Sequence, residues 1–108
     1  MKNERIIDKL IAHGEKIQHY CFGYEKDLFM DNMLLVEACV FNLSQMGELM
    51  HHLDEDYQRK HPEIPWRAVY GLRNRIVHDY DGVNVELIWQ IISEDLDDLL
   101  AQLRALKD

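Results

Sequence analysis

Apolar residues recur at intervals of three and four along most of this chain, which is the spacing of one face of an α-helix. The clearest run follows Asn84 and consists of Leu87, Ile88, Ile91, Ile92, Leu96, Leu99, Leu100, Leu103 and Leu106. A similar run occupies residues 3–21 and consists of Ile6, Ile7, Leu10, Ile11, Gly14, Ile17 and Cys21. No stretch alternates apolar and polar residues as a half-buried strand does. The pattern therefore predicts an all-α chain.

The stretch from about residue 30 to 52 is apolar on most of its sides. Its apolar residues are Met33, Leu34, Leu35, Val36, Ala38, Cys39, Val40, Phe41, Leu43, Met46, Leu49 and Met50. A helix that is apolar nearly all round is central in its bundle, or it buries a further face against another molecule.

The helix boundaries follow from proline, glycine and capping residues. Residues 61–65, with the sequence HPEIP, interrupt the helical pattern, and Pro65 suits the first position of a new helix. That helix is expected to run to about His78. Asp81-Gly82 then ends it, and Asn84 can cap the last helix.

Four main helices with short connections predict an antiparallel bundle. A short extra helix is expected at residues 54–60. A chain of 108 residues has the length of one small domain, so we expect residues 1–108 to form a single helical domain.

The formal net charge of −8 argues against a broad nucleic-acid-binding surface. The charge is unevenly distributed, because residues 59–78 contain five cations and one anion, Glu63, and so carry +4 against −12 for the rest. The cations are Arg59, Lys60, Arg67, Arg73 and Arg75. They form either a local site for anions or a chance cluster on a solvated helix.

Cys21 and Cys39 are the only cysteines, and their spacing predicts neither a disulfide framework nor a zinc site. The N-terminal sequence MKNERIIDKL lacks the apolar run of a signal peptide. No stretch approaches the roughly 18 apolar residues that a membrane span needs. We expect a cytoplasmic protein that does not contact the membrane.

Residues 73–80, with the sequence RNRIVHDY, combine arginine, histidine and tyrosine around an apolar pair. On a helix, Arg73 falls in line with an apolar stripe made of Trp66, Val69, Ile76, Val77 and Tyr80. An arginine there is costly to bury unless it is paired or lies at the rim of a cleft, although its stem could simply cover apolar surface. The opposite face carries Arg67, Gly71, Asn74, Arg75 and His78.

Arg73 and His78 point about 140° apart on a straight helix with about 100° per residue. One copy of that helix cannot easily direct both side chains at the same atom, whereas two facing copies could. Together with the apolar stretch at about 30–52, this geometry predicts a homodimer with the motif at its interface.

The motif has the form R-x4-H-x-Y, with Arg73, His78 and Tyr80 in the three places. It resembles the signature of the HEPN superfamily and of the HepT-type toxins within it. The segments around it, SQMGELM, HPEIPWRAVYGLRN and DGVNVELIW, are similar to that family too, and the resemblance covers essentially the whole chain.

This resemblance implies a helical bundle that dimerises through the motif region. It also implies a metal-independent ribonuclease that acts as a toxin and is paired with a minimal nucleotidyltransferase antitoxin. By the same resemblance, Tyr80 is the hydroxyl that an antitoxin would nucleotidylate.

RNA cleavage without a metal needs a proton acceptor, a proton donor and a cation for the phosphorane. His78 can serve as base or acid near neutral pH, and Arg73 can hold phosphate oxygens with two parallel donors. Asn74 could orient the imidazole from one turn earlier, and Tyr80 could contact phosphate or base. The supporting or RNA-binding residues are Asn74, Arg75, Tyr80 and Arg67. Without the resemblance, His78 would be read as a solvated or capping histidine at a helix end.

No metal or other cofactor is expected. His51 and His52 point apart on a helix, and neither they nor His61 have matching carboxylates. The acidic run Glu94, Asp95, Asp97 and Asp98 is predicted to be a solvated face or a docking site for a basic partner. An alternative to the ribonuclease is a non-catalytic helical partner, or substrate-binding subunit, of a minimal nucleotidyltransferase.

Overall fold

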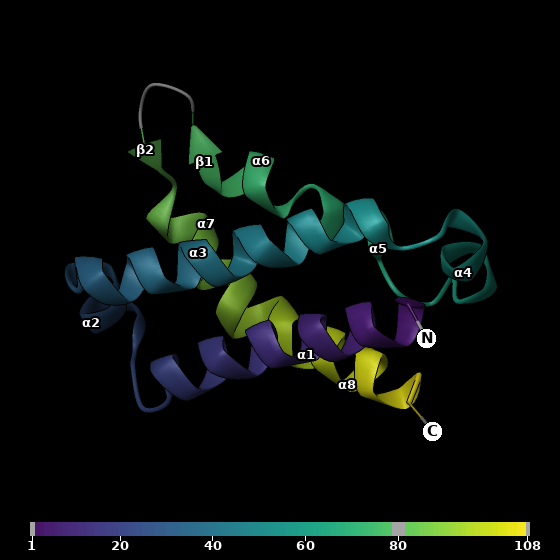
Figure 1. Cartoon of the computed structure of the whole chain (residues 1–108). Helices are drawn as coiled ribbons and strands as arrows, with labels where there is room; N and C mark the ends of the chain where they lie inside the picture. Colours follow the sequence, from purple (N-terminus) through teal and green to yellow (C-terminus); the bar gives the residue numbers. More distant parts are fainter. Residues whose placement is uncertain (1, 79–81, 108) are drawn as a thin grey trace.

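The computed structural model describes residues 2–78 and 82–107, without the side chains of Val77 and His78. Nearly all of the described chain is helical (Figure 1). Its elements are α1 (Lys2–Cys21), α2 (Lys26–Asp31), α3 (Met33–Leu49), the 3₁₀ turn η1 (Met50–His52), α4 (Glu55–Lys60), α5 (Trp66–Tyr70), α6 (Leu72–Ile76), β1 (Val77–His78), β2 (Gly82–Val83), α7 (Val85–Gln90), the π-helical turn η2 (Ile91–Asp95) and α8 (Leu96–Ala105). The predicted all-α fold is confirmed.

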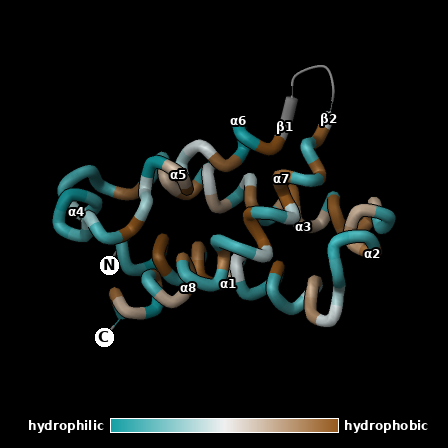
Figure 2. Tube along the Cα trace, turned by 180° about the vertical axis from the view of Figure 1, so that it is seen from behind, coloured by the Kyte–Doolittle hydropathy of each residue, from teal (hydrophilic) through white to brown (hydrophobic). Residues whose placement is uncertain are grey.

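The long helices pack as an antiparallel bundle. α1 and α3 lie side by side and run in opposite directions, and α8 returns along α1 so that the two chain ends lie close together (Figure 1). Along α1 and α8 the hydrophobic residues alternate with hydrophilic ones turn by turn (Figure 2). Their buried side chains join one continuous core with those of α3. The 3–4 spacing of apolar residues therefore predicted the buried faces of both helices.

α3 is the element that contacts most of the others, namely α1, α2, α5, α6 and α7. Its buried residues are Leu35, Val36, Cys39, Asn42, Leu43, Met46 and Gly47, which at 3.6 residues per turn cover an arc of about 140°. The other side is open, and Leu34 and Phe41 are 82% and 59% exposed. Both explanations for its all-round apolar character thus have support: α3 is central, and it also exposes a large apolar face.

The last helix follows the prediction at its start and departs from it in the middle. The Asn84 side chain accepts a hydrogen bond of 3.1 Å from the Leu87 amide, so it caps α7 as expected. Residues Ile91–Asp95 then form one π-helical turn before α8 begins. Such turns occur within α-helices mostly as local insertions and are frequent at functional sites.

The predicted helix from Pro65 to about His78 is wrong at its carboxyl end. Gly71 separates α5 from α6, and α6 ends at Ile76. Val77 and His78 instead pair with Val83 and Gly82 in an antiparallel hairpin, so the expectation of no strand was also wrong here.

Two backbone features mark the hairpin that follows the helix. The Ile76 carbonyl accepts a hydrogen bond of 2.8 Å from the Asn84 amide, so it is bound to the start of α7 rather than to a further helical turn. Gly82 has a φ of 85°, in the left-handed region that glycine adopts without a steric cost.

The predicted helix at about 30–52 is also shorter than expected at both ends. α2 precedes it and buries Phe29, and Asn32 separates the two helices by accepting a hydrogen bond of 3.1 Å from the Leu35 amide. Asparagine is a preferred N-cap residue, so this boundary could have been read from the sequence.

The two cysteines, which lie on α1 and at the middle of α3, are both buried free thiols. Their sulfur atoms are 3.6 Å apart. The hydrogen bond with Cys21 and burial in the core raise the pKa of the Cys39 thiol, so that thiol stays protonated. Within the described residues, no helix has the length and apolar content to cross a bilayer.

Gly47 brings α3 close to the junction of α5 and α6. A Cβ atom there would lie 3.4 Å from the carbonyl oxygens of both Val69 and Tyr70. An alanine would make ordinary contacts, whereas a longer side chain would have to pass two fixed carbonyl groups.

We therefore predict opposite effects of two substitutions at this position. Gly47→Ala should be neutral or should stabilise by up to about 1 kcal/mol, because alanine favours the helix. Gly47→Leu should destabilise by about 1–3 kcal/mol through overpacking. Urea unfolding measures both, and equal stability of the two variants would contradict the close approach.

Candidate active site

The arginines of the motif lie on a short helix that is held by two apolar anchors. Leu72 and Ile76 of α6 are buried, while Arg73, Asn74 and Arg75 are exposed. At about 100° per residue, Asn74 points directly away from the buried ridge, and Arg73 and Arg75 leave it on opposite flanks. α6 therefore presents two separate cationic groups to solvent.

The predicted apolar stripe is only partly correct. Trp66, Val69 and Ile76 are buried as expected. Arg73 is exposed, so it needs no partner to offset a cost of burial. Leu72 takes the inward position at the start of α6, which leaves Arg73 on the flank. Of the residues predicted to share another face, Arg67, Asn74 and Arg75 are exposed and Gly71 is half-buried, but Arg67 lies on α5 and the other two on α6.

Trp66 is buried and fixes the start of this region. Its indole N–H donates to the carbonyl oxygens of His61 at 2.9 Å and Gln58 at 3.1 Å. It thereby ties α5 to the proline-containing loop and to α4. Trp89 is half-buried and packs on Phe29 with ring centroids 5.1 Å apart.

His78 lies in β1, two residues beyond the end of α6. Its side chain, and the whole of Tyr80, are outside the described residues. Because α6 ends at Ile76, the angle of about 140° between Arg73 and His78, which assumed a continuous helix, does not apply. The predicted one-turn relation between Asn74 and His78 fails for the same reason.

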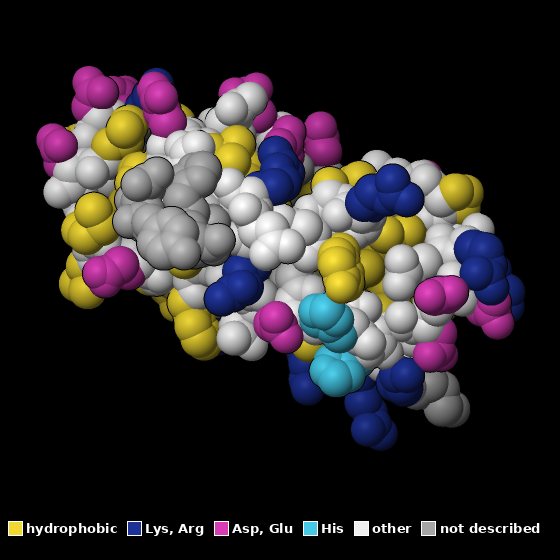
Figure 3. Space-filling model, turned by 90° about the horizontal axis from the view of Figure 1, so that it is seen from above, with side chains coloured by type: hydrophobic (Ala, Val, Ile, Leu, Met, Phe, Trp, Pro, Cys, Tyr) yellow, Lys and Arg dark blue, Asp and Glu magenta, His cyan; other side chains and the backbone are white. Residues whose placement is uncertain are grey.

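The positive segment has paired and unpaired members. Arg59 forms ion pairs with Asp56 and Glu55 on its own short helix α4. Arg67, Arg73 and Arg75 form no ion pair with a carboxylate of the described residues. In the view onto the face that carries α6 and the hairpin, Lys and Arg side chains lie among apolar ones, and many acidic side chains gather at the upper edge (Figure 3).

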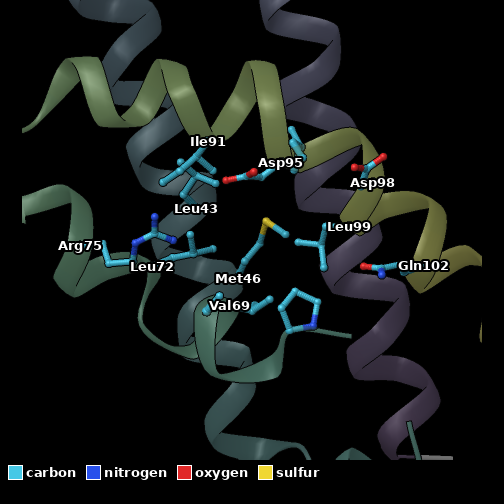
Figure 4. Close-up of a pocket in the computed structure, with 13 residues that line it drawn as sticks. Leu43, Met46, Val69, Leu72, Arg75, Ile91, Asp95, Asp98, Leu99 and Gln102 are labelled. Carbon is cyan, nitrogen blue, oxygen red and sulfur yellow. The ribbon is translucent and has the colours of Figure 1, made fainter. Parts of the chain in front are cut away.

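A cleft of about 330 Å³ opens beside Arg75 (Figure 4). Arg75 lies on one side, and Asp95, Asp98 and Gln102 lie on the other. The acidic run is exposed, as predicted for a solvated face, but its role in lining this cleft was missed. The sequence could have indicated this role, because positions 91, 95, 99 and 102 share one face of a helix.

The histidines outside the motif have individual neighbours. The ring of His51 lies 4.9 Å from that of Tyr70, and the ring of His61 lies 4.7 Å from that of Tyr57. Within residues 2–78 and 82–107, no three or more His, Cys, Asp or Glu side chains are grouped so that they could hold a metal ion.

Comparison with known proteins agrees with the motif. The family described as "Ribonuclease HepT-like" matches residues 10–106, which include α6 and the hairpin. "Putative RNase TTE0752" of Caldanaerobacter subterraneus subsp. tengcongensis is 31% identical over 105 residues, or 96% of this chain and 94% of that protein. "Probable ribonuclease HepT" of Thermococcus cleftensis is 34% identical over 70 residues, or 65% of this chain and 64% of that protein. No solved structure matches this chain. The protein therefore belongs to the HepT-like ribonuclease family of the HEPN superfamily, as the R-x4-H-x-Y motif predicted.

Proposed function

We propose that this HepT-like ribonuclease cleaves RNA without a metal ion, with Arg73 and His78 as its catalytic residues. The observation that carries the proposal is the exposure of Arg73 on the flank of α6, without an ion pair to a described carboxylate. His78 follows within the hairpin that continues from the same helix. An unpaired guanidinium and an imidazole are the groups that attack by a 2′-hydroxyl requires.

The reaction is an internal transfer of the phosphate. The 2′-oxygen loses its proton and bonds to phosphorus, the bond from phosphorus to the 5′-oxygen breaks, and the 5′-oxygen gains a proton. His78 serves as the base or the acid, because imidazole titrates near neutral pH. Arg73 donates two hydrogen bonds to phosphate oxygens and offsets the charge that develops on them.

The neighbouring residues have supporting roles in this proposal. Arg67 is an exposed cation that attracts the phosphate backbone. Arg75 is an exposed cation that binds the RNA, and Asn74 lies between Arg73 and Arg75 on the outward side of α6. Tyr80, by resemblance to the family, contacts the RNA and is the residue that an antitoxin would modify.

We place the enzyme in a toxin–antitoxin pair with a minimal nucleotidyltransferase as the antitoxin. Family membership and the complete R-x4-H-x-Y motif support this assignment. The competing role is that of a non-catalytic partner of such a nucleotidyltransferase. Cleavage that depends on His78 separates the two roles, because a non-catalytic partner has no use for a proton-transfer group.

RNA cleavage by the purified protein should continue in excess chelator and should leave 2′,3′-cyclic phosphate ends. His78→Ala should lower the rate by about 10²–10⁴-fold, the usual contribution of general acid–base catalysis. His52→Ala, which changes an exposed histidine outside the motif, is the matched control. Gel analysis and mass spectrometry of the products measure these effects. Activity that vanishes with chelator and returns with magnesium would overturn the mechanism.

A homodimer is the second part of the proposal, and an exposed apolar patch supports it. The patch consists of Phe22, Leu28, Met33, Leu34 and Phe41. Three of its members, Phe22, Leu28 and Met33, line one hollow where α1 leads through α2 into α3. Phe41 lies two helical turns after Leu34 on the open side of α3. A group of large exposed apolar side chains of this kind marks an interaction surface.

Phe41→Glu should therefore convert a dimer into a monomer, because a carboxylate in an apolar interface is costly to desolvate. The control is Lys16→Glu, which places the same side chain at an exposed position of α1. Light scattering at micromolar concentration gives the mass, and circular dichroism checks folding. A monomeric wild-type protein would refute the dimer.

The resemblance to the family implies dimerisation through the motif region, so the dimer is proposed to form a composite site from Arg73 of one protomer and His78 of the other. A mixed dimer of an Arg73→Ala chain and a His78→Ala chain then has one intact cleft and one with both residues missing. Random exchange in a two-fold dimer makes half of the dimers mixed, so mixing the inactive variants should restore up to about a quarter of the wild-type activity. No recovery, with exchange verified by mass-labelled subunits, would mean that each chain builds its own site.

A further inference from the structure

The cleft beside Arg75 lies between three parts of the chain that are distant in sequence. α3 contributes Leu43 and Met46, the α5–α6 region contributes Val69 and Leu72, and the last helix contributes Leu99 together with other apolar residues. Its volume of about 330 Å³ is at the lower end of the range of roughly 300–1,000 Å³ for small-molecule pockets. The cleft thus has the size and apolar lining of a site for one flat ring system.

Opposite charges face each other across this apolar space. Arg75 and Asp95 extend from α6 and η2 towards one another, with the Met46 side chain below them (Figure 4). Among the described residues, no ion pair joins Arg75 to Asp95 or to Asp98. Two exposed groups of opposite sign that form no ion pair with each other can be bridged by a ligand that carries both acceptors and donors.

The π-helical turn carries Asp95. Asp95 is its last residue, and it is flanked in the cleft by the buried side chains of Ile91 and Leu96. A π turn inserts one extra residue into the helical register and is frequent at functional sites. Here its last residue is a carboxylate that lines the apolar cleft.

We infer that this cleft binds the guanine base of the RNA substrate, an assignment that rests on the proposed ribonuclease function. Guanine carries two acceptors, O6 and N7, on one edge, which arginine contacts with two parallel donors. It carries two donors, N1–H and the N2 amino group, on its Watson–Crick edge, and a carboxylate can accept from both. Arg75 and Asp95 supply these two complementary groups, and the accessible apolar residues of the rim, Pro65, Ala68 and Leu99, can contact a ring face.

The other bases match this pair of groups less well. Adenine presents a donor amino group beside N7, so it cannot offer Arg75 two adjacent acceptors. Cytosine and uracil are single rings that would leave part of the apolar lining exposed. Guanine is therefore expected to bind more tightly than the other three bases.

The position of the cleft determines where the bound guanine lies relative to the cleavage site. Arg75 and Arg73 leave α6 on opposite flanks, and the exposed Asn74 lies between them. A strand whose phosphate contacts Arg73 can cross α6 and place a neighbouring base in the cleft. The subsite therefore selects a guanine close to the scissile phosphate and takes no part in proton transfer.

The test is a titration of the full-length protein with nucleoside 5′-monophosphates up to millimolar concentration, followed by nuclear magnetic resonance. GMP should bind most tightly and shift the signals of Leu72 and Leu99, which line the cleft. Asp95→Asn and Arg75→Gln should each weaken GMP by about 5- to 150-fold, the discrimination of a two-bond contact. Glu94→Gln, at the preceding exposed position, should leave GMP binding unchanged.

Base analogues assign each contact. IMP lacks the N2 amino group, so wild type should prefer GMP to IMP and Asp95→Asn should lose that preference. The 7-deaza analogue of GMP lacks N7, so wild type should prefer GMP to it and Arg75→Gln should lose that preference. A variant that is merely damaged in folding would weaken all ligands alike.

Equal binding of the four nucleotides, no binding of GMP, or an Asp95→Asn variant that behaves like Glu94→Gln would each overturn the guanine subsite. RNA cleavage by the wild type and by Asp95→Asn is measured in a separate assay from nucleotide binding. If the wild type cleaves RNA and Asp95→Asn keeps the same cut pattern, the subsite fails and the ribonuclease stands. If GMP binds as described but no RNA is cleaved, the ribonuclease proposal fails and the site stands as a guanine-nucleotide site.

Discussion

The packing of α3 against its neighbours is the constraint on which the rest of the structure depends. One edge of its buried arc meets α1, and the other meets the junction of α5 and α6. Gly47 sets the distance on the second edge, because the Val69 and Tyr70 carbonyl oxygens lie where a side chain would begin. The placement of α6, and with it Arg73 and Arg75, follows from this contact between a helix backbone and a residue without a side chain.

α6 is short, and its shortness is useful for function. Its two buried residues anchor it, so that the three residues between them are free to face solvent. The hydrogen bond from the Asn84 amide to the Ile76 carbonyl ends the helix and joins it to the start of α7. Two cationic side chains therefore flank one ridge: Arg73 is the proposed phosphate contact, and Arg75 borders the cleft opposite Asp95.

Much of the fold could be predicted from the sequence, since the 3–4 spacing in the first and last helices reports directly which residues are buried. The helix end at Ile76 could not, because it depends on pairing with residues 82–83 and on a hydrogen bond from Asn84. The angle of about 140° between Arg73 and His78, which first suggested a composite site, does not apply because the helix ends at Ile76. The dimer proposal now depends instead on the exposed apolar patch around Leu34 and Phe41.

The sequence by itself determined the helical class, the family and the positively charged segment, because periodicity, motif spacing and charge are properties of neighbouring residues. Only the tertiary structure decided which half of α3 is covered, that Arg73 is exposed, and that Arg75 and Asp95 face each other. The physical reason is that burial and the distance between charges depend on contacts between residues far apart in the chain. Leu43, Leu72 and Leu99 line the same cleft although no local pattern relates them.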